Sequence, residues 1–241
     1  MASLVVRFQY ERATLQGRFE AIVRRIMTIC VLVAAISITG CGLINWVSYV
    51  FAPASRMKTI KAEFGGLKGK SVAVVVYADL ETQVDYPTVQ LELCDVVAAE
   101  MRRHIKAVRL IDPRTIIRYQ SENPRWDIMP PEKLCEVFNC DYVLLISLME
   151  FSTRERGSVY LARGRIKADV SVYQSGLSSA DGANPVWRGE PLSIRFPRQS
   201  TLGVPAENDQ VIRVQTERLF ATELVKKFYD YEVPKEADES K

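Results

Sequence analysis

The sequence contains a single histidine, His104, among 241 residues, and this scarcity limits the catalytic systems that it can build. A Ser-His-Asp or Cys-His nucleophile needs an imidazole held against its partners. His104 follows Arg102-Arg103 near the end of a predicted helix, where a solvated side chain is expected. The sequence also lacks a Gly-x-x-x-x-Gly-Lys-Ser/Thr phosphate loop. We therefore predict that the protein is not an enzyme and needs no cofactor.

Paired cysteine ligands are missing as well. Cys135 and Cys140 are separated by four residues, and no second pair follows them, so no metal site is predicted. Cys94 falls on the apolar face of a predicted helix, where it would act as a small hydrophobe. Cys135 and Cys140 straddle a helix-to-strand joint, and their spacing leaves both a disulfide and two free thiols open.

The formal net charge is only +3, and all of it lies in the first 40 residues, which hold five arginines and two glutamates. The remainder of the chain is formally neutral. A neutral domain has no overall field that attracts a polyanion. Nucleic acid is therefore not an expected partner.

The first 41 residues carry the strongest signal in the chain. Arg24-Arg25 precede an apolar run from Ile26 to Ile38, and Thr39-Gly40-Cys41 follow it. Cations, an apolar run and small residues in this order are typical of a bacterial secretory signal.

The residues Ile38, Thr39, Gly40 and Cys41 resemble a lipobox. The resemblance implies a signal peptide over 1–40, cleavage before Cys41 and lipid on that cysteine, which would hold the chain on a membrane. Initiation at Val23 would leave 1–22 untranslated. Position 42 holds Gly42 rather than the aspartate that resembles an inner-membrane retention signal. The absence of this aspartate favours attachment to the periplasmic side of the outer membrane.

An uncleaved signal anchor is the alternative. No charged residue occurs between Arg25 and Arg56, and 43–51 prolongs the apolar stretch. About 20 apolar residues suffice to span a bilayer, and Trp46 and Tyr49 would suit the interface. The chain would then be a single-pass subunit that self-assembles in a secretion or envelope complex. Both interpretations place most of the chain outside the cytoplasm.

After the anchor, the sequence predicts a tether over 41–67, a single α/β domain over 68–230 and a disordered tail over 231–241. The run Val72–Tyr77 is continuously apolar, which indicates a strand buried on both faces. We predict a mixed β-sheet packed with helices in the order β-α-β-α-α-β-β-β-α. The predicted elements are strand 72–77, helix 87–106, strand 108–111, helix 114–120, a helix after Pro130-Pro131, strands 142–149, 162–173 and 186–196, and helix 209–228.

Three segments, Val72–Tyr77, Cys140–Leu145 and Pro185–Glu190, together resemble a group of envelope proteins. The group comprises the amino-terminal domain of the Tol translocation protein, the curli-secretion lipoprotein and lipoprotein activators of penicillin-binding proteins. The resemblance spans 68–229 and implies a shared architecture. The charged segment Ser152–Gly157 does not suit a lipid-facing hairpin, so a membrane pore is not expected.

The segment Pro124–Pro130 is a candidate site for binding a partner. It combines Arg125, Trp126 and Met129 between two prolines. Residues of these types make interface hot spots, although a loop of this kind also plugs the edge of a sheet.

Two charged segments have alternative interpretations. Arg163 and Arg165 belong to a basic strip that we expect to form a solvated face of mixed charge. Contact with lipid headgroups or an acidic partner is the alternative. Asp79, Glu81 and Asp85 belong to an acidic segment, 79–85, which is predicted to be a loop after the first strand, where open α/β sheets often hold ligands. Those three carboxylates are either solvated or form the cation site of an enzyme.

Taken together, these patterns favour a membrane-anchored, non-catalytic envelope lipoprotein. Its membrane contact would be the lipidated Cys41, and its partner would be an unidentified envelope protein. The alternatives are a self-associating subunit and a cation-dependent enzyme that uses Asp79, Glu81 and Asp85.

Overall fold

The computed structural model describes residues 57–158, 160–176, 184–198, 203–205 and 209–234. The chain divides into two compact units, one of Met1–Lys58 with Val233–Lys241 and one of Thr59–Glu232. The expected lipobox, signal anchor and Cys41 lie outside the described residues. The described residues contain no helix whose length and apolar character would let it cross a membrane.

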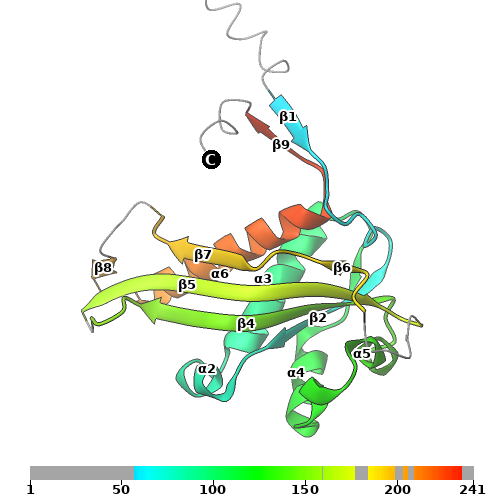
Figure 1. Ribbon diagram of the computed structural model, residues 1–241, viewed down its shortest axis with the longest axis horizontal. Coiled ribbons are helices and arrows are strands. Elements are labelled where there is room, and N and C mark those ends of the chain that lie inside the picture. Colours follow the sequence, from blue (N-terminus) through cyan, green and yellow to red (C-terminus); the bar gives the residue numbers. More distant parts are fainter. Residues whose placement is uncertain (1–56, 159, 177–183, 199–202, 206–208, 235–241) are drawn as a thin grey trace, which may run out of the picture. The chain divides into compact units, whose positions relative to one another are not determined.

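A mixed β-sheet forms the centre of the unit Thr59–Glu232 (Figure 1). Its strand order is β3-β2-β4-β5-β6, and β7 and β8 also pair with β5. Strands β3 and β4 run parallel to β2, whereas β5 is antiparallel to β4 and to β6, β7 and β8. The predicted α/β class with a mixed sheet is confirmed. The sheet strands are β2 (Ser71–Tyr77), β3 (Arg109–Leu110), β4 (Tyr142–Arg154), β5 (Leu161–Gln174), β6 (Trp187–Arg188), β7 (Leu192–Phe196) and β8 (Val204–Pro205).

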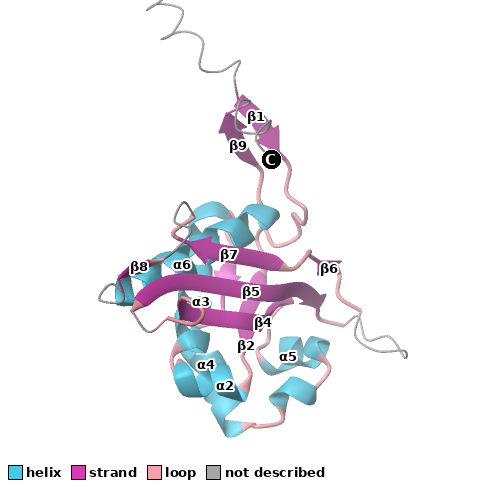
Figure 2. Cartoon of the chain, turned by 60° about the vertical axis from the view of Figure 1, so that its left-hand side comes forward, coloured by secondary structure: helices cyan, strands magenta, loops and turns pink. Residues whose placement is uncertain are grey.

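Helices cover both faces of the sheet (Figure 2). The helices are α2 (Leu80–Asp85), α3 (Val89–His104), α4 (Pro113–Glu122), α5 (Pro131–Val137) and α6 (Asp209–Val225), with the 3₁₀ turns η2 (Trp126–Ile128) and η4 (Lys226–Phe228). On one face, Val74 of β2 packs in a cluster with apolar residues of α3 and α6. On the other face, Val75 packs with residues of α4 and α5. Burial on both faces explains why β2 is apolar at consecutive positions.

The acidic segment that was expected to be a loop is instead the short helix α2. Asp79 is its N-cap, and the carboxylate accepts a hydrogen bond from the backbone N–H of Thr82 at 2.8 Å. Asp is among the best N-cap residues because its oxygen satisfies an orphan N–H of the first turn. The loop prediction was wrong because it counted these carboxylates as solvated groups and overlooked capping.

Asp141 joins the beginning of β4 to the beginning of β2. Its Oδ2 accepts hydrogen bonds from the backbone N–H and the hydroxyl of Ser71, both at 2.7 Å, and the Ser71 hydroxyl accepts from the Asp141 N–H at 2.9 Å. These hydrogen bonds lower the pKa of Asp141, and Lys70 and Arg109 lower it further. The aspartate in the segment Cys140–Leu145 thus has a structural role at a strand joint.

The two ends of the described chain pair with each other. Strands β1 (Met57–Ile60) and β9 (Tyr231–Pro234) form a two-stranded sheet. Next to it, Asp230 accepts hydrogen bonds from the ammonium of Lys61 at 2.7 Å and from the N–H of Ala62 at 2.9 Å.

These contacts correct the expected limits of the tether and the tail. Residues 57–60 lie within the expected tether, and Leu67 is fully buried. Residues 231–234 lie within the expected disordered tail but form a strand. Residues 41–56 and 235–241 are outside the described part of the chain. The prediction failed here because each segment gains order only from a partner at the opposite end of the chain.

Candidate interaction surface

The segment 123–130, here called the Trp126 loop, lies between α4 and α5 at the carboxyl end of β2. Trp126 is only 8% exposed and packs edge to face against Tyr77, the last residue of β2, with ring centroids 6.0 Å apart. Trp126 also belongs to the apolar cluster beneath α4 and α5. The buried indole therefore anchors the loop to the sheet.

Hydrogen bonds fix the path of the loop. The N–H of Trp126 donates to the carbonyl of Asn123 at 2.9 Å, and the N–H of Met129 donates to that of Trp126 at 3.2 Å. The Asn123 amide donates to the carbonyl of Tyr119 at 2.9 Å, and the Tyr119 hydroxyl contacts the Met129 sulfur at 3.6 Å. Prolines at 124 and 130 restrict the backbone further. The loop is thus held in one shape.

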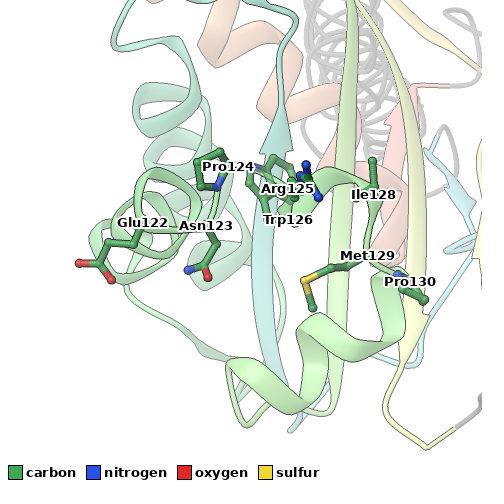
Figure 3. Close-up of a pocket in the computed structure, with 8 residues that line it drawn as sticks. All are labelled: Glu122, Asn123, Pro124, Arg125, Trp126, Ile128, Met129 and Pro130. Atoms are coloured by element: carbon green, nitrogen blue, oxygen red, sulfur yellow. The ribbon is translucent and has the colours of Figure 1, made fainter.

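A groove of about 650 Å³ opens at this loop (Figure 3). The side chain of Ile128 is 74% exposed, whereas that of Trp126, two residues earlier in the same 3₁₀ turn, is buried. The groove is lined by Glu122, Asn123, Pro124, Arg125, Trp126, Ile128, Met129 and Pro130. It combines exposed apolar groups with one acidic and one basic side chain.

The structure brings together the three predicted residues of this loop, Arg125, Trp126 and Met129, around one groove. Sequence reasoning missed Ile128, the most exposed apolar side chain among them. From the sequence, an isoleucine between Asp127 and Met129 is expected to be a core residue. Only the direction of the 3₁₀ turn shows that it faces solvent.

The basic strip differs from the expected solvated face. Arg165 is 8% exposed, and its guanidinium donates to Glu150 and Glu155, each at 3.0 Å, and to the carbonyl of Arg154 at 2.7 Å. Arg163 pairs with Glu155 at 3.0 Å. The expectation of a wet face is wrong at Arg165, because the long β4–β5 hairpin folds carboxylates over its cations.

Glu155 is the centre of this network. Burial acts to raise its pKa, but the Arg156 N–H and the Arg165 and Arg163 guanidiniums outweigh burial, and the pKa is lowered. Arg163 and Arg165 thus both pair with carboxylates inside the hairpin.

The carboxylates of Asp79, Glu81 and Asp85 are placed on or next to α2 and do not form a cluster. Throughout the described ranges, no group of three or more His, Cys, Asp or Glu side chains is arranged to hold a metal ion. His104 pairs with Glu100 at 3.3 Å and stacks on the ring of Tyr229 at 4.5 Å.

A partly buried polar cluster between α3 and α6 was not predicted. Arg213 of α6 donates to Thr88 at 2.9 Å and to Glu217 at 3.3 Å, and it also pairs with Glu92 of α3. Burial, followed by the neighbouring Glu92, raises the pKa of Glu217 to about 7. Glu217 is 3% exposed and so is closed to a substrate. The cluster links two helices.

No protein-family model matches the sequence, and no curated protein matches it. Among solved structures, the lipoprotein GNA1162 from Neisseria meningitidis is 19% identical, with a match over 54% of this chain and 85% of that one and a TM-score of 0.38. The PelC dodecamer from Paraburkholderia phytofirmans is 11% identical over 72% of this chain and 98% of that one, with a TM-score of 0.41.

A minor lipoprotein from Acinetobacter baumannii is 10% identical, over 66% of this chain and 91% of that one, with a TM-score of 0.33. The solved structures that this chain resembles thus include bacterial lipoproteins. At these identities and TM-scores the likeness assigns no activity or partner. The resemblance to the Tol, curli-secretion and activator group stays a prediction.

Proposed function

We propose that this chain is a membrane-anchored, non-catalytic envelope lipoprotein that serves as an accessory or scaffold by binding another envelope protein at the Trp126 loop. The observation that carries the proposal is a rigid loop with a buried aromatic anchor and an exposed Ile128 beside a groove of about 650 Å³. The Ile38–Cys41 lipobox pattern supports the membrane anchor.

The Trp126 loop has the properties of a protein-binding site. The loop combines exposed apolar side chains with Trp, Met and Arg. Residues of these types dominate the energetics of protein interfaces. The loop is fixed by its hydrogen bonds and prolines, so little conformational entropy is lost on binding. Large apolar groups on a flexible loop would bind less tightly.

The lining of the groove defines the chemistry of its partner. Ile128, Met129 and Trp126 suit an apolar side chain, and Glu122 and Arg125 offer one negative and one positive group at the same groove. A protein segment with a large apolar residue flanked by polar groups of both signs fits this surface. Charges of both signs at an interface chiefly select the partner and its register.

A photo-crosslinking amino acid at position 128 tests the binding site in the native envelope. We expect an adduct with another envelope protein at position 128 and none when the probe is placed at Val211, an exposed apolar residue of α6. Glu122→Lys with Arg125→Glu should reduce the yield from position 128. Equal yields at positions 128 and 211 would contradict the proposal.

The same experiment distinguishes the proposed accessory protein from a self-associating subunit. An adduct whose mass is that of two copies of this chain would favour a self-assembling subunit over an accessory protein. Light scattering of the purified chain then gives the oligomeric mass directly.

Cys41→Ser tests the anchor. A lipoprotein precursor with this change should stay uncut and lose its acyl label, whereas the unmutated chain should carry the two or three acyl chains that stable anchoring needs. A signal anchor would be indifferent to the change. A mature chain that begins before Cys41 would contradict the lipoprotein proposal.

A further inference from the structure

Cys135 and Cys140 occupy the two ends of the turn that closes α5. The N–H of Cys140 donates to the carbonyl of Cys135 at 2.9 Å, and the N–H of Asn139 donates to that of Glu136 at 3.2 Å. Asn139 has a φ of +46°. This pattern is a Schellman motif, in which the side chains at the two end positions commonly pack against each other. Here both of those side chains are thiols.

The surroundings keep the two thiols together. Cys135 and Cys140 are 1% and 6% exposed and belong to one apolar cluster with Leu134 and Val143. The Cys135 thiol donates to the carbonyl of Tyr173 at 3.8 Å, and the Cys140 thiol donates to that of Tyr142 at 3.2 Å. The interaction between the two neighbouring thiols raises the pKa of Cys135 and lowers that of Cys140. Cys140 is therefore the sulfur that forms a thiolate first, and the thiolate is the attacking species.

Cys94 provides the contrast within the same protein. It lies on α3 in the other apolar cluster, and its thiol donates to the carbonyl of Val74 at 3.1 Å. Burial raises the pKa of Cys94 to about 12, so its thiol stays protonated. Cys94 behaves as a small core residue, whereas Cys135 and Cys140 lie at the two ends of one turn in the same apolar cluster.

We propose that Cys135 and Cys140 are a redox pair that closes to an intrachain disulfide in an oxidising compartment and thereby ties the end of α5 to the start of β4. The oxidant is a disulfide, either of a small thiol or of a protein. The Cys140 thiolate attacks one of its sulfurs and expels the other as a thiolate. The Cys135 thiolate then attacks the Cys140 sulfur of the mixed disulfide and expels the second thiolate.

The exchange balances in both protons and electrons. The two protons lost by Cys135 and Cys140 are taken up by the two released thiolates. The cysteine pair is oxidised by two electrons, and the oxidant disulfide is reduced by two. Since both side chains are buried, exchange takes place while the chain folds or when α5 opens locally. The proposal does not depend on the binding site proposed at the Trp126 loop.

The test uses the full-length chain in detergent, refolded in buffers with graded ratios of oxidised to reduced glutathione. Free thiols are then blocked with iodoacetamide under denaturing conditions, and tryptic peptides are weighed. Cys135 and Cys140 share one tryptic peptide, 134–154, and Cys94 lies on another, 71–102. In oxidising buffer we expect the peptide 134–154 to be unblocked and lighter by two hydrogen atoms, with Cys94 blocked.

Thermal unfolding provides the second measurement. The oxidised chain should melt about 5 °C above the reduced chain, as expected for a short disulfide loop in a domain of this size. Cys135→Ala and Cys140→Ala should each abolish this difference, and Cys94→Ala should keep it. The mass of the tryptic peptide 134–154 is measured on the unmutated chain. It therefore shows whether the disulfide forms even if a variant fails to fold.

Two outcomes would overturn the proposal. Blocking of both Cys135 and Cys140 in oxidising buffer, to the same extent as Cys94, would show that the bond does not form. A stable glutathione adduct at Cys140 would show that the Cys135 sulfur cannot reach it.

Discussion

Trp126 packs edge to face on Tyr77, with ring centroids 6.0 Å apart, so the residue that ends β2 also anchors the loop between α4 and α5. A single aromatic contact thus connects strand β2 to the proposed binding surface. Because Trp126 is buried and Ile128 is exposed, the stability of the loop and its binding capacity reside in different side chains.

Trp126→Ala should lower the free energy of unfolding by about 3–5 kcal/mol, because it removes a buried aromatic group and leaves a cavity. Urea unfolding of the purified chain measures the change. The matched control is Ile128→Ala in the same 3₁₀ turn, which should stay within about 0.5 kcal/mol because Ile128 is exposed. Equal losses in the two variants would show that the anchor is misassigned.

Arg165→Ala should cost about 3 kcal/mol of stability, because Glu150 and Glu155 would keep their charges in a half-buried place without their main partner. The control is Arg156→Ala. Arg156 also pairs with Glu150 at 3.0 Å, but its side chain is 75% exposed, so a change of about 0.5 kcal/mol or less is expected. Chemical unfolding at low and moderate salt compares the two. If Arg165→Ala left the free energy of unfolding unchanged, the expectation of a solvated face would be correct after all.

Glu217 should make the protein less stable as the pH rises. Its pKa is raised from 4.5 to about 7 in the folded state, so the folded chain holds this proton more tightly than the unfolded chain. The resulting stabilisation is fully present below pH 4.5 and is lost as the pH rises to about 7; it amounts to about 3 kcal/mol.

Glu217→Gln keeps a neutral side chain of the same shape and should remove this pH dependence. The free energy of unfolding of Glu217→Gln should therefore exceed that of the unmutated chain by the largest amount above pH 7. Urea unfolding between pH 5 and pH 8 provides the comparison, with Glu81→Gln on the exposed side of α2 as the control. A parallel pH profile for Glu217→Gln and the unmutated chain would contradict the assignment.

Gly164→Ala should destabilise the packing of α6 on β5 by about 1–3 kcal/mol, the usual cost of overfilling a packed core. A Cβ at position 164 would overlap the hydroxyl of Thr216 and lie 2.7 Å from its Cβ. Gly65→Ala is the control, because a Cβ there has no neighbour within 4 Å. Thermal unfolding of the two variants measures the difference. A Gly164→Ala chain as stable as Gly65→Ala would show that α6 shifts at no cost.

Local sequence patterns were sufficient for the sheet and most of its helices. The continuous apolar run at 72–76 fits a strand covered on both faces, and the helical spacing of Cys94, Val97 and Met101 fits the buried side of α3. The predicted strand 186–196 became two strands, β6 and β7, both of which pair with β5. Such patterns work because burial imposes a period on the residues of each element.

The proposed binding surface was predictable only in part. Trp126 and two prolines within seven residues indicated an ordered loop, whereas the exposure of Ile128 depends on the direction of one turn. The burial of Arg165 was also hidden, because alternation along β5 shows which face a side chain takes but not what covers that face.

The sequence by itself determined the α/β class, the buried strand β2 and the Ile38–Cys41 pattern, because each depends on neighbouring residues or on a short period. Only the tertiary structure decided that 57–60 pairs with 231–234, that Glu150 and Glu155 neutralise Arg165, and that Trp126 packs on Tyr77. These contacts join residues distant in the chain, and no local pattern records which distant partner a side chain meets when the core closes.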